Sequence, residues 1–468
     1  MTFNLATILA ESASAYPDRA VAVLEGRKLT YAELDAASGR VAGALLGAGL
    51  HCGDRVGVQL PNSFEFLYAY FGILKAGLVM VPINPQLKAA EIGHMMEDSG
   101  AALLIDTLDD PLLGSGSAVP MALTQAGDTA VIIYTSGTTG KPKGAELSHF
   151  QLYLNCTIAG ETFGVRPEDV SLAALPFFHI YGLSGLINCA VRYGGAMVLV
   201  PRFEPQAVFD LIAEHRITVL AGVPTMYHAL WMAEVGDRDL SCLRLASSGG
   251  ASMPEALLTG FEKKFGVVIL EGYGMSETGS TATMNQSATQ RKPLSVGKPI
   301  WGVQCRIVSP LGDDLPDGSV GELWLRGHVV MKGYFGNPLA TAETVVDGWL
   351  RTGDLAYRDP DGFLFLVDRI KDLIIRGGYN VYPREVEEVL YGHPAVAEAA
   401  VIGRPDDRLG EEVVAVVAPK PGCTIDVDEL IAHCRERLAL YKCPREVRVL
   451  ASLPKSDTGK LLKRELRR

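Results

Sequence analysis

The sequence lacks the features of a nucleic-acid-binding, disulfide-rich or secreted protein. Its 43 Lys and Arg residues are outnumbered by 54 Asp and Glu residues, and the formal net charge of −11 argues against a basic surface for nucleic acid. The eight cysteines are scattered and contain no Cys-x-x-Cys pair, which argues against a zinc ribbon or a dithiol redox site. The N-terminus has neither the basic flank nor the long apolar core of a signal peptide. We therefore expect a cytoplasmic protein with reduced thiols.

The sequence also lacks a convincing transmembrane run. The nearest case is Val170–Val191, which contains no Asp, Glu, Lys or Arg. Pro176, Gly182 and Gly185 interrupt it, and this favours a buried strand, loop and helix over a membrane span. Peripheral contact with a membrane stays open.

What the first part of the chain does contain is a regular alternation of helix and strand patterns. Thr30 and Glu33 lie at the two ends of a capping-box pattern, which predicts the start of a helix. Strand patterns at Arg55–Leu60, Leu78–Pro82 and Ala102–Ile105 alternate with helix patterns that begin near Phe64 and cover Ala89–Glu97. Such alternation predicts an α/β fold with a largely parallel sheet.

Two changes of character divide the rest of the chain. Between about Pro299 and Leu366, short strand patterns separated by Pro-Asp-Gly-type turns predict a small β subdomain. After Asp368–Lys371 follows a unit of about a hundred residues, a normal size for a domain. Its predicted helices are Arg384–Leu390 and Asp428–Leu438, and its predicted strands are Ala397–Gly403, Glu412–Pro419 and Glu446–Val449. We predict a large N-terminal α/β domain of several subdomains, residues 1–369, and a mobile C-terminal α+β domain, residues 370–468.

The stretch Tyr134–Gly144, YTSGTTGKPKG, has the composition of a phosphate-binding loop after an apolar strand. A Walker loop needs four residues before its Gly-Lys pair and a Ser or Thr after the lysine. Here only two residues separate Gly137 from Gly140, and Pro142 follows the lysine. The spacing excludes the Walker geometry but not another kind of phosphate loop.

YTSGTTGKPKG resembles the signature loop of the adenylate-forming superfamily, which includes acyl-CoA synthetases, peptide-synthetase adenylation domains and luciferase-like enzymes. Five further blocks resemble those of the family in the expected order: 248–251, 272–278, 350–355, 368–380 and 454–460. The resemblance covers nearly the whole chain, from about Leu5 to Leu466. The loop at 106–128 looks short for the family, so we expect a trimmed surface loop or a lost strand.

The resemblance implies a binding site for ATP and Mg²⁺. Tyr273 would stack on adenine, Asp354 would accept the ribose hydroxyls, and Glu277 would hold Mg²⁺, which prefers a few oxygen ligands plus phosphates. Taken alone, Glu277 would more often be a helix-start residue. The nucleotide-binding residues implied in this way are Thr135, Ser136, Gly137, Thr138, Thr139, Lys143, Gly249, Gly250, Ala251, Gly272, Tyr273, Gly274, Met275, Ser276, Asp354 and Arg369.

The resemblance also gives roles to the C-terminal domain. Lys460 would be the catalytic lysine that neutralises charge between the α-phosphate and the attacking carboxylate. Lys371 would be the hinge of a domain rotation that presents first Lys460 and then the coenzyme A channel. That channel would be lined by Gly377, Gly378 and Tyr379.

For the acid, the resemblance places His179 beside the carboxylate channel with a catalytic role, although a satisfied, partly buried histidine is nearly as common. The implied acyl pocket consists of His179, Tyr181, Val223, Gly274 and Met275, with Met226 nearby. A bulky aromatic in place of Gly274 restricts relatives to very short acids, so glycine predicts a deep pocket for a medium- to long-chain fatty acid.

Several alternatives stay open from the sequence. The acid could be an aryl acid, and the enzyme could be a stand-alone acyl-AMP ligase or a luciferase-like oxygenase. A fused carrier domain is not expected, because the chain ends soon after Lys460, and coenzyme A is therefore the expected thiol. From another class, the chain could be a nucleotide sensor that kept the fold and lost catalysis.

Overall fold

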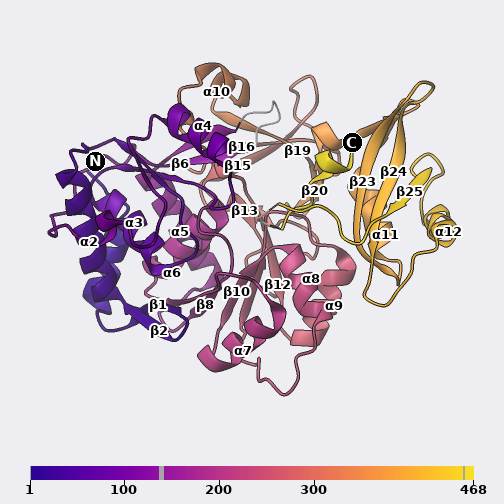
Figure 1. Cartoon of the computed structure of the whole chain (residues 1–468). Helices are drawn as coiled ribbons and strands as arrows, with labels where there is room; N and C mark the ends of the chain where they lie inside the picture. Colours follow the sequence, from indigo (N-terminus) through magenta and orange to yellow (C-terminus); the bar gives the residue numbers. More distant parts are fainter. Residues whose placement is uncertain (1, 136–141, 457–458, 468) are drawn as a thin grey trace.

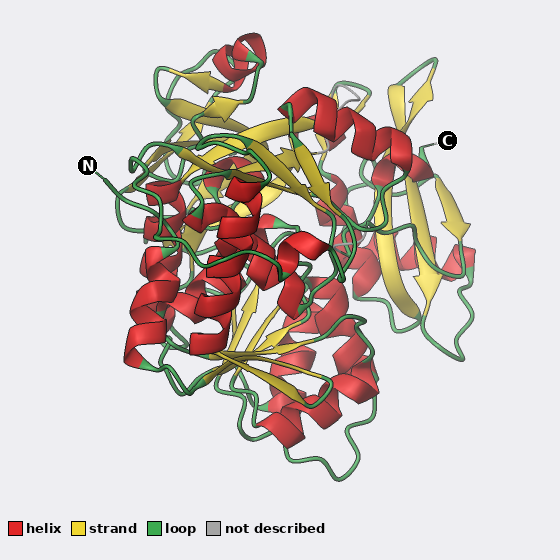
Figure 2. Ribbon diagram, turned by 60° about the vertical axis from the view of Figure 1, so that its left-hand side comes forward, coloured by secondary structure: helices red, strands yellow, loops and turns green. Residues whose placement is uncertain are grey.

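The computed structural model describes residues 2–135, 142–456 and 459–467. Within them the chain forms four β-sheets, three in the N-terminal part and one in the C-terminal part (Figure 1). Figure 2 shows the C-terminal sheet standing beside the larger α/β body. The predicted fold class is confirmed.

The first sheet has six strands in the order β17-β7-β6-β4-β3-β5, and its β3–β6 part is parallel. The Thr30 hydroxyl accepts from the Glu33 N–H at 3.2 Å, so the predicted capping box starts the helix beside this sheet. The strands are β3 (Arg55–Val58), β4 (Val79–Pro82), β5 (Leu103–Ile105), β6 (Thr129–Thr135), β7 (Lys143–Ser148) and β17 (Gly333–Tyr334). The neighbouring helices are α1 (Thr7–Ala15), α2 (Tyr31–Gly47), α3 (Phe64–Lys75), α4 (Ala89–Ser99) and α5 (His149–Phe163).

The loop between β5 and β6 lies tightly on α2. It contains one 3-10 turn, η1 (Pro111–Leu113), and no strand among its residues, all of which the structure describes. A side chain on Gly43 would overlap the Ser117 carbonyl oxygen, so the loop and the helix approach through backbone. The stretch is therefore a packed connection without a strand of its own.

The second sheet has nine strands in the order β14-β13-β12-β11-β10-β8-β9-β1-β2 and is parallel from β12 to β1. Phe209 and Phe261 from two of its helices are fully buried in its core. The strands are β1 (Ala20–Leu24), β2 (Arg27–Thr30), β8 (Val170–Ala173), β9 (Ala196–Leu199), β10 (Val219–Gly222), β11 (Leu245–Ser248), β12 (Ile269–Tyr273), β13 (Thr283–Met284) and β14 (Lys298–Pro299). The helices are η2 (Tyr181–Asn188, a π-helix), α6 (Cys189–Arg192), α7 (Pro205–His215), α8 (Pro224–Met232), α9 (Glu255–Phe265) and the 3-10 turn η3 (Ser276–Thr278).

The apolar run 170–191 is thus divided into β8, a loop, η2 and α6, as predicted. In the part of the chain that the structure describes, no helix combines the length and the hydropathy that a membrane crossing requires.

The third and fourth sheets meet at the predicted domain boundary. β20 belongs to the small β subdomain, and the next strand, β21, belongs to the C-terminal sheet. The subdomain consists of β15 (Val303–Val308), β16 (Gly321–Gly327), α10 (Pro338–Thr344), β18 (Val345–Val346), β19 (Trp349–Arg358) and β20 (Leu364–Arg369). The C-terminal part consists of η4 (Ile370–Asp372), β21 (Ile374–Arg376), β22 (Tyr379–Val381), α11 (Pro383–Tyr391), β23 (Val396–Asp406), β24 (Gly410–Pro419), α12 (Val427–Arg437), β25 (Glu446–Val449) and α13 (Lys463–Leu466).

Candidate active site

Asp354 lies at the centre of a buried hydrogen-bond network. It is 6% exposed, and Arg369 faces it across the β19–β20 ladder. The Tyr273 hydroxyl donates to Asp354 Oδ2 at 2.6 Å, and the Arg369 Nε lies 3.0 Å from Oδ1. Three residues from separate sequence blocks therefore meet at one carboxylate. The Arg369 guanidinium balances the charge of the Asp354 carboxylate. The carboxylate oxygens have further lone pairs, which can accept hydrogen bonds from sugar hydroxyls.

Glu277 lies in η3, close enough to Asp354 and Arg369 to interact with their charges. Burial raises the pKa of its carboxyl, while a hydrogen bond from the Tyr334 hydroxyl at 2.9 Å acts in the opposite direction. That bond uses Oε1, and no other side chain of the described residues donates to this carboxylate. A single carboxylate with one oxygen free of side-chain donors fits Mg²⁺ that takes its other ligands from phosphates and water.

The two ends of the predicted phosphate loop are held by a strand pair. Thr135 ends β6 and faces Lys143, the first residue of β7. The Lys143 ammonium lies 5.2 Å from the centre of the Tyr334 ring. The other loop residues predicted to bind phosphate, Ser136, Gly137, Thr138 and Thr139, lie outside the described residues.

The predicted adenine-side loop, Gly249, Gly250 and Ala251, directly follows β11. Gly250 has φ +79°, a left-handed conformation that favours glycine. The Ser248 hydroxyl before this loop is buried and has no hydrogen-bond partner among the described residues. A buried hydroxyl of this kind needs a partner, which a bound nucleotide could supply. Gly272, Met275 and Ser276 lie on β12 and at η3, between this loop and Glu277.

His179 lies beside the same site as a neutral ring. The Tyr181 N–H donates to His179 Nδ1 at 3.2 Å, which assigns the ring proton to Nε2. Burial and the neighbouring Lys460 ammonium lower the pKa of His179 to about 4. The ring can therefore donate a hydrogen bond to a carboxylate at neutral pH.

Two of the residues predicted to line the acyl pocket, Tyr181 and Val223, lie in one apolar cluster, whereas Met275 packs against the main core of the N-terminal part. Tyr181 and Met226 pack against three buried residues at the ends of β8 and β10 (Leu175, Ala221 and Val223). The Tyr181 hydroxyl is hydrogen-bonded to the Ser247 hydroxyl at 3.1 Å.

Gly274 has a second explanation besides pocket depth. A side chain here would overlap the carbonyl oxygen of Ser280, whose φ of +116° is unusual for a residue other than glycine. Backbone packing therefore requires glycine at 274. Its missing side chain is no sign by itself of a deep pocket.

Lys460 reaches the site from the C-terminal domain. Its N–H donates to the Ser456 hydroxyl at 3.1 Å, and an isolated bridge between Lys455 and Leu461 closes this turn. A side chain on Gly459 would overlap the Thr225 hydroxyl at the start of α8, so the turn lies against the N-terminal domain. Partial desolvation, followed by the charge of Arg369, lowers the pKa of the exposed Lys460 ammonium to about 8.

The structure does not bring the predicted coenzyme A channel to this site. Gly377 and Gly378 form an exposed two-residue turn between β21 and β22 with φ values of +58° and +83°. A turn with two positive φ values favours glycine at both positions, so the hairpin explains this pair. Tyr379 is 60% exposed and stacks on Tyr441 at 4.7 Å. Lys371, the predicted hinge, lies in η4 between the two sheets and is exposed.

Sequence reasoning missed two contacts that shape the site. Tyr334 touches Glu277 across 57 residues of sequence, and Thr225 meets the Lys460 turn. Neither residue belongs to a block of the family resemblance. The only sequence signal for Tyr334 is an aromatic residue after glycine, and that pattern is too common to interpret alone.

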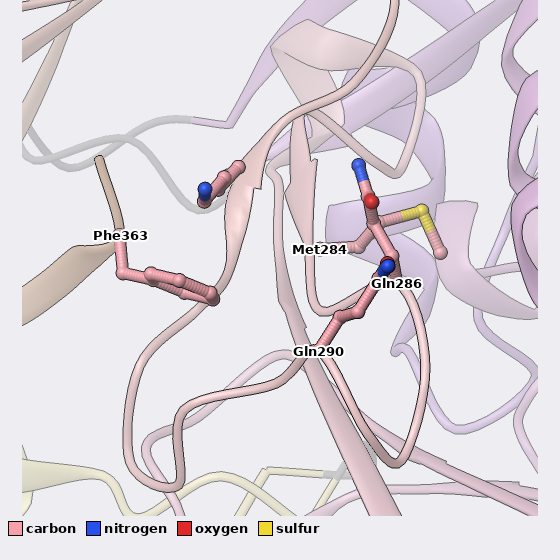
Figure 3. Close-up of a pocket in the computed structure, with 5 residues that line it drawn as sticks. Met284, Gln286, Gln290 and Phe363 are labelled. Atoms are coloured by element: carbon pink, nitrogen blue, oxygen red, sulfur yellow. The ribbon is translucent and has the colours of Figure 1, made fainter. Parts of the chain in front are cut away.

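A hollow lies away from the candidate site residues described above (Figure 3). It is lined by Met284, Gln286, Gln290, Lys298 and Phe363. The ammonium of Lys298 lies 4.6 Å from the centre of the Phe363 ring. None of the residues predicted for ATP, acid or thiol lines this hollow.

Two family models match the chain. The model described as AMP-binding enzyme covers residues 9–335, and the model for the AMP-binding enzyme C-terminal domain covers residues 385–460. Feruloyl-CoA synthase of an Amycolatopsis species is 40% identical, with 95% of this chain and 94% of that protein covered. A long-chain-fatty-acid–CoA ligase of Bacillus subtilis is 35% identical, with 99% and 94% covered.

Solved structures also match the fold of this chain along nearly its full length. The anthranilate CoA ligase AuaEII in complex with anthranoyl-AMP matches with a TM-score of 0.94 at 28% identity, with 100% of this chain and 97% of that chain covered. ATP-bound MatB from Rhodopseudomonas palustris matches with a TM-score of 0.91 at 35% identity, with 99% and 98% covered. Together with the matched residues, these similarities show that the chain belongs to the AMP-binding enzyme family of adenylate-forming acid–thiol ligases.

Proposed function

We propose that the protein is an ATP-dependent acyl-CoA synthetase. A carboxylate attacks the α-phosphate of ATP, which gives an acyl-adenylate and pyrophosphate, and the thiol of coenzyme A then displaces AMP. The observation that carries the proposal is the Lys460 turn, which lies against Thr225 of the N-terminal domain and within electrostatic reach of Asp354, Arg369 and His179. A cation at this position can neutralise the charge that develops when carboxylate and phosphate approach.

Each nearby residue has a role that follows from its surroundings. Asp354 would bind the ribose hydroxyls, and Arg369 would hold Asp354 and contact the nucleotide. His179 would donate from Nε2 to the acid's carboxylate. Glu277 would hold Mg²⁺, which would supply positive charge to the phosphates when bound. The expected catalysis is positioning and charge neutralisation, with no covalent enzyme intermediate.

The acid should be an apolar monocarboxylic acid. Tyr181, Val223 and Met226, which pack together, carry no charge that could pair with a second carboxylate. A medium- to long-chain fatty acid is the first candidate, supported by the similarity to the B. subtilis fatty-acid ligase. An aryl acid is the second candidate. The similarity to feruloyl-CoA synthase supports it, as does the Ser280 backbone, which occupies the space where a side chain of residue 274 would lie.

Substrate profiling tests this proposal. Purified protein would be incubated with MgATP, coenzyme A and, separately, octanoate, palmitate, ferulate, benzoate, acetate and malonate, and mass spectrometry would detect acyl-AMP and acyl-CoA. We expect turnover of octanoate or palmitate first and of ferulate or benzoate second. Exclusive use of acetate or malonate would contradict the apolar pocket. Absence of pyrophosphate exchange with every acid would favour a nucleotide sensor instead.

A further inference from the structure

Tyr334 is placed by strand pairing between the phosphate loop and Glu277. β17, which contains Tyr334, pairs antiparallel with β7, so that Tyr334 faces Ala145 and Gly333 faces Glu146. β7 is the strand that leaves the predicted phosphate loop at Lys143. Tyr334 is therefore in register with the end of that loop, although nearly two hundred residues of sequence separate them.

The backbone around Tyr334 is also tied to Glu277 itself. The Met331 N–H donates to the Glu277 carbonyl at 2.8 Å, and the Phe335 N–H donates to the Gly144 carbonyl at the same distance. The Tyr334 N–H donates to the Thr341 hydroxyl at 2.9 Å. The segment on both sides of Tyr334 is thus fixed to the two elements that its side chain touches, and the 2.9 Å contact between its hydroxyl and Glu277 Oε1 has a rigid support.

The hydrogen bond matters because Glu277 is 6% exposed. A buried carboxylate depends on its hydrogen-bond partners, because water does not replace a partner that is lost. Without this donor, the carboxylate would lose a partner for Oε1 and would be free to turn.

We propose that Tyr334 is a positioning residue for the cation that accompanies ATP. Its hydroxyl occupies Glu277 Oε1 and leaves Oε2 for Mg²⁺, and its ring faces the Lys143 ammonium at the end of the phosphate loop. The inference rests on the proposed role of Glu277 in the ATP-dependent reaction. It assigns to Tyr334 a part in metal affinity that is separate from nucleotide affinity.

The test is the gain in affinity that Mg²⁺ gives to a non-hydrolysable ATP analogue, measured by titration calorimetry with and without the metal. In Tyr334→Phe we expect this gain to fall about ten-fold, because a hydrogen bond to a charged group is lost. Affinity without Mg²⁺ should stay unchanged. The apparent KM for Mg²⁺ in pyrophosphate exchange should rise by a similar factor.

Tyr193→Phe is the matched control. The Tyr193 hydroxyl donates to the Thr157 carbonyl at 2.7 Å, so this variant also loses one tyrosine hydrogen bond, and none of the site residues is its partner. We expect its Mg²⁺ gain to equal that of the wild type. Thermal unfolding of all variants would confirm that they fold.

Glu277→Gln separates the two proposals. If Glu277→Gln removes the Mg²⁺ gain and Tyr334→Phe does not change it, the inference on Tyr334 is wrong and the proposed function stands. If Tyr334→Phe weakens binding equally with and without Mg²⁺, Tyr334 has only a structural role and the inference is also wrong. If Glu277→Gln leaves the gain unchanged, the metal role of Glu277 and the inference fall together. Support requires that Tyr334→Phe has no further effect in the Glu277→Gln background.

Discussion

Two glycine-containing turns of the C-terminal domain differ in what surrounds them. Gly459, beside Lys460, touches the Thr225 hydroxyl so closely that no side chain fits. Gly378, beside the predicted thiol channel, has no atom within 4 Å of the place where a side chain would begin. Both have positive φ, at +76° and +83°. The first turn is engaged with the N-terminal domain and the second faces solvent, which is the arrangement that adenylate formation would need if Lys460 acts as proposed.

Polar contacts of α11 with the N-terminal domain help to hold the engaged arrangement beside Lys460. Arg384 in α11 donates from its backbone N–H to Asp368 Oδ2 at 2.9 Å and from its guanidinium to the Leu366 carbonyl. Glu388 accepts from the Glu255 N–H at 3.3 Å. Pro254 precedes α9 and provides no side-chain cap, so Glu388 of the other domain takes that place. The proposed domain rotation would have to release these polar contacts.

The largest expected effect comes from Lys460→Ala. We expect acid-dependent pyrophosphate exchange to fall at least ~100-fold, because an aligned cation is removed from the transition state. Thioester formation from synthetic acyl-adenylate and coenzyme A should stay close to that of the wild type. Lys263→Ala, which removes an exposed lysine of α9, is the control. Equal loss of both half-reactions would contradict separate roles for the two turns.

Alanine in place of Gly459 or Gly378 should slow different half-reactions. Gly459→Ala should reduce adenylation about ten-fold, because the Lys460 turn must move away from Thr225. Gly378→Ala meets no neighbour here and should reduce mainly thioester formation, through the strain of a positive φ. Single-turnover assays of each step would measure both. If Gly378→Ala slowed adenylation as much as Gly459→Ala, the comparison would be wrong.

The pH dependence of the adenylation rate should follow the protonation of Lys460. Its pKa is lowered to about 8, so the charged form prevails below that pH and is lost as the pH rises through it. We expect kcat/KM for adenylation to decline above about pH 8, since this parameter reports the free enzyme. In Lys460→Arg, any activity that remains should persist to higher pH, because arginine keeps its charge. An unchanged alkaline limb would exclude Lys460 as its origin.

The smallest effect is expected from Glu388→Gln. The amide would hold the Glu255 N–H less strongly than the carboxylate, a change of about 0.5–1 kcal/mol for a helix start. The engaged arrangement should become less populated, so the ratio of thioester formation to adenylation should rise two- to four-fold. Glu436→Gln, on the exposed face of α12, is the control. A lower ratio would mean that Glu388 does not favour the engaged arrangement.

The local patterns predicted the elements, and the family blocks predicted which residues lie near one another. Capping at Thr30, the alternation that builds the sheets, and the meeting of Tyr273, Asp354 and Arg369 were all accessible, because each depends on short stretches or on a family block. Tyr334 was not accessible, since its contact with Glu277 depends on the pairing of β17 with β7. A deep pocket was predicted from glycine at position 274. In the structure, the Ser280 carbonyl oxygen occupies the place where a side chain would lie, so glycine there is explained by backbone packing.

Both large sheets of the N-terminal domain are completed by strands from distant parts of the sequence. The hairpin of β1 and β2, residues 20–30, forms the edge of the nine-stranded sheet by pairing with β9, while β17 at residues 333–334 joins the six-stranded sheet. In a nascent chain on the ribosome, the β1–β2 hairpin therefore has no β9 to pair with until residue 199 has emerged. The six-stranded sheet waits longer still for its last strand. We therefore expect both sheets to be completed only late in synthesis.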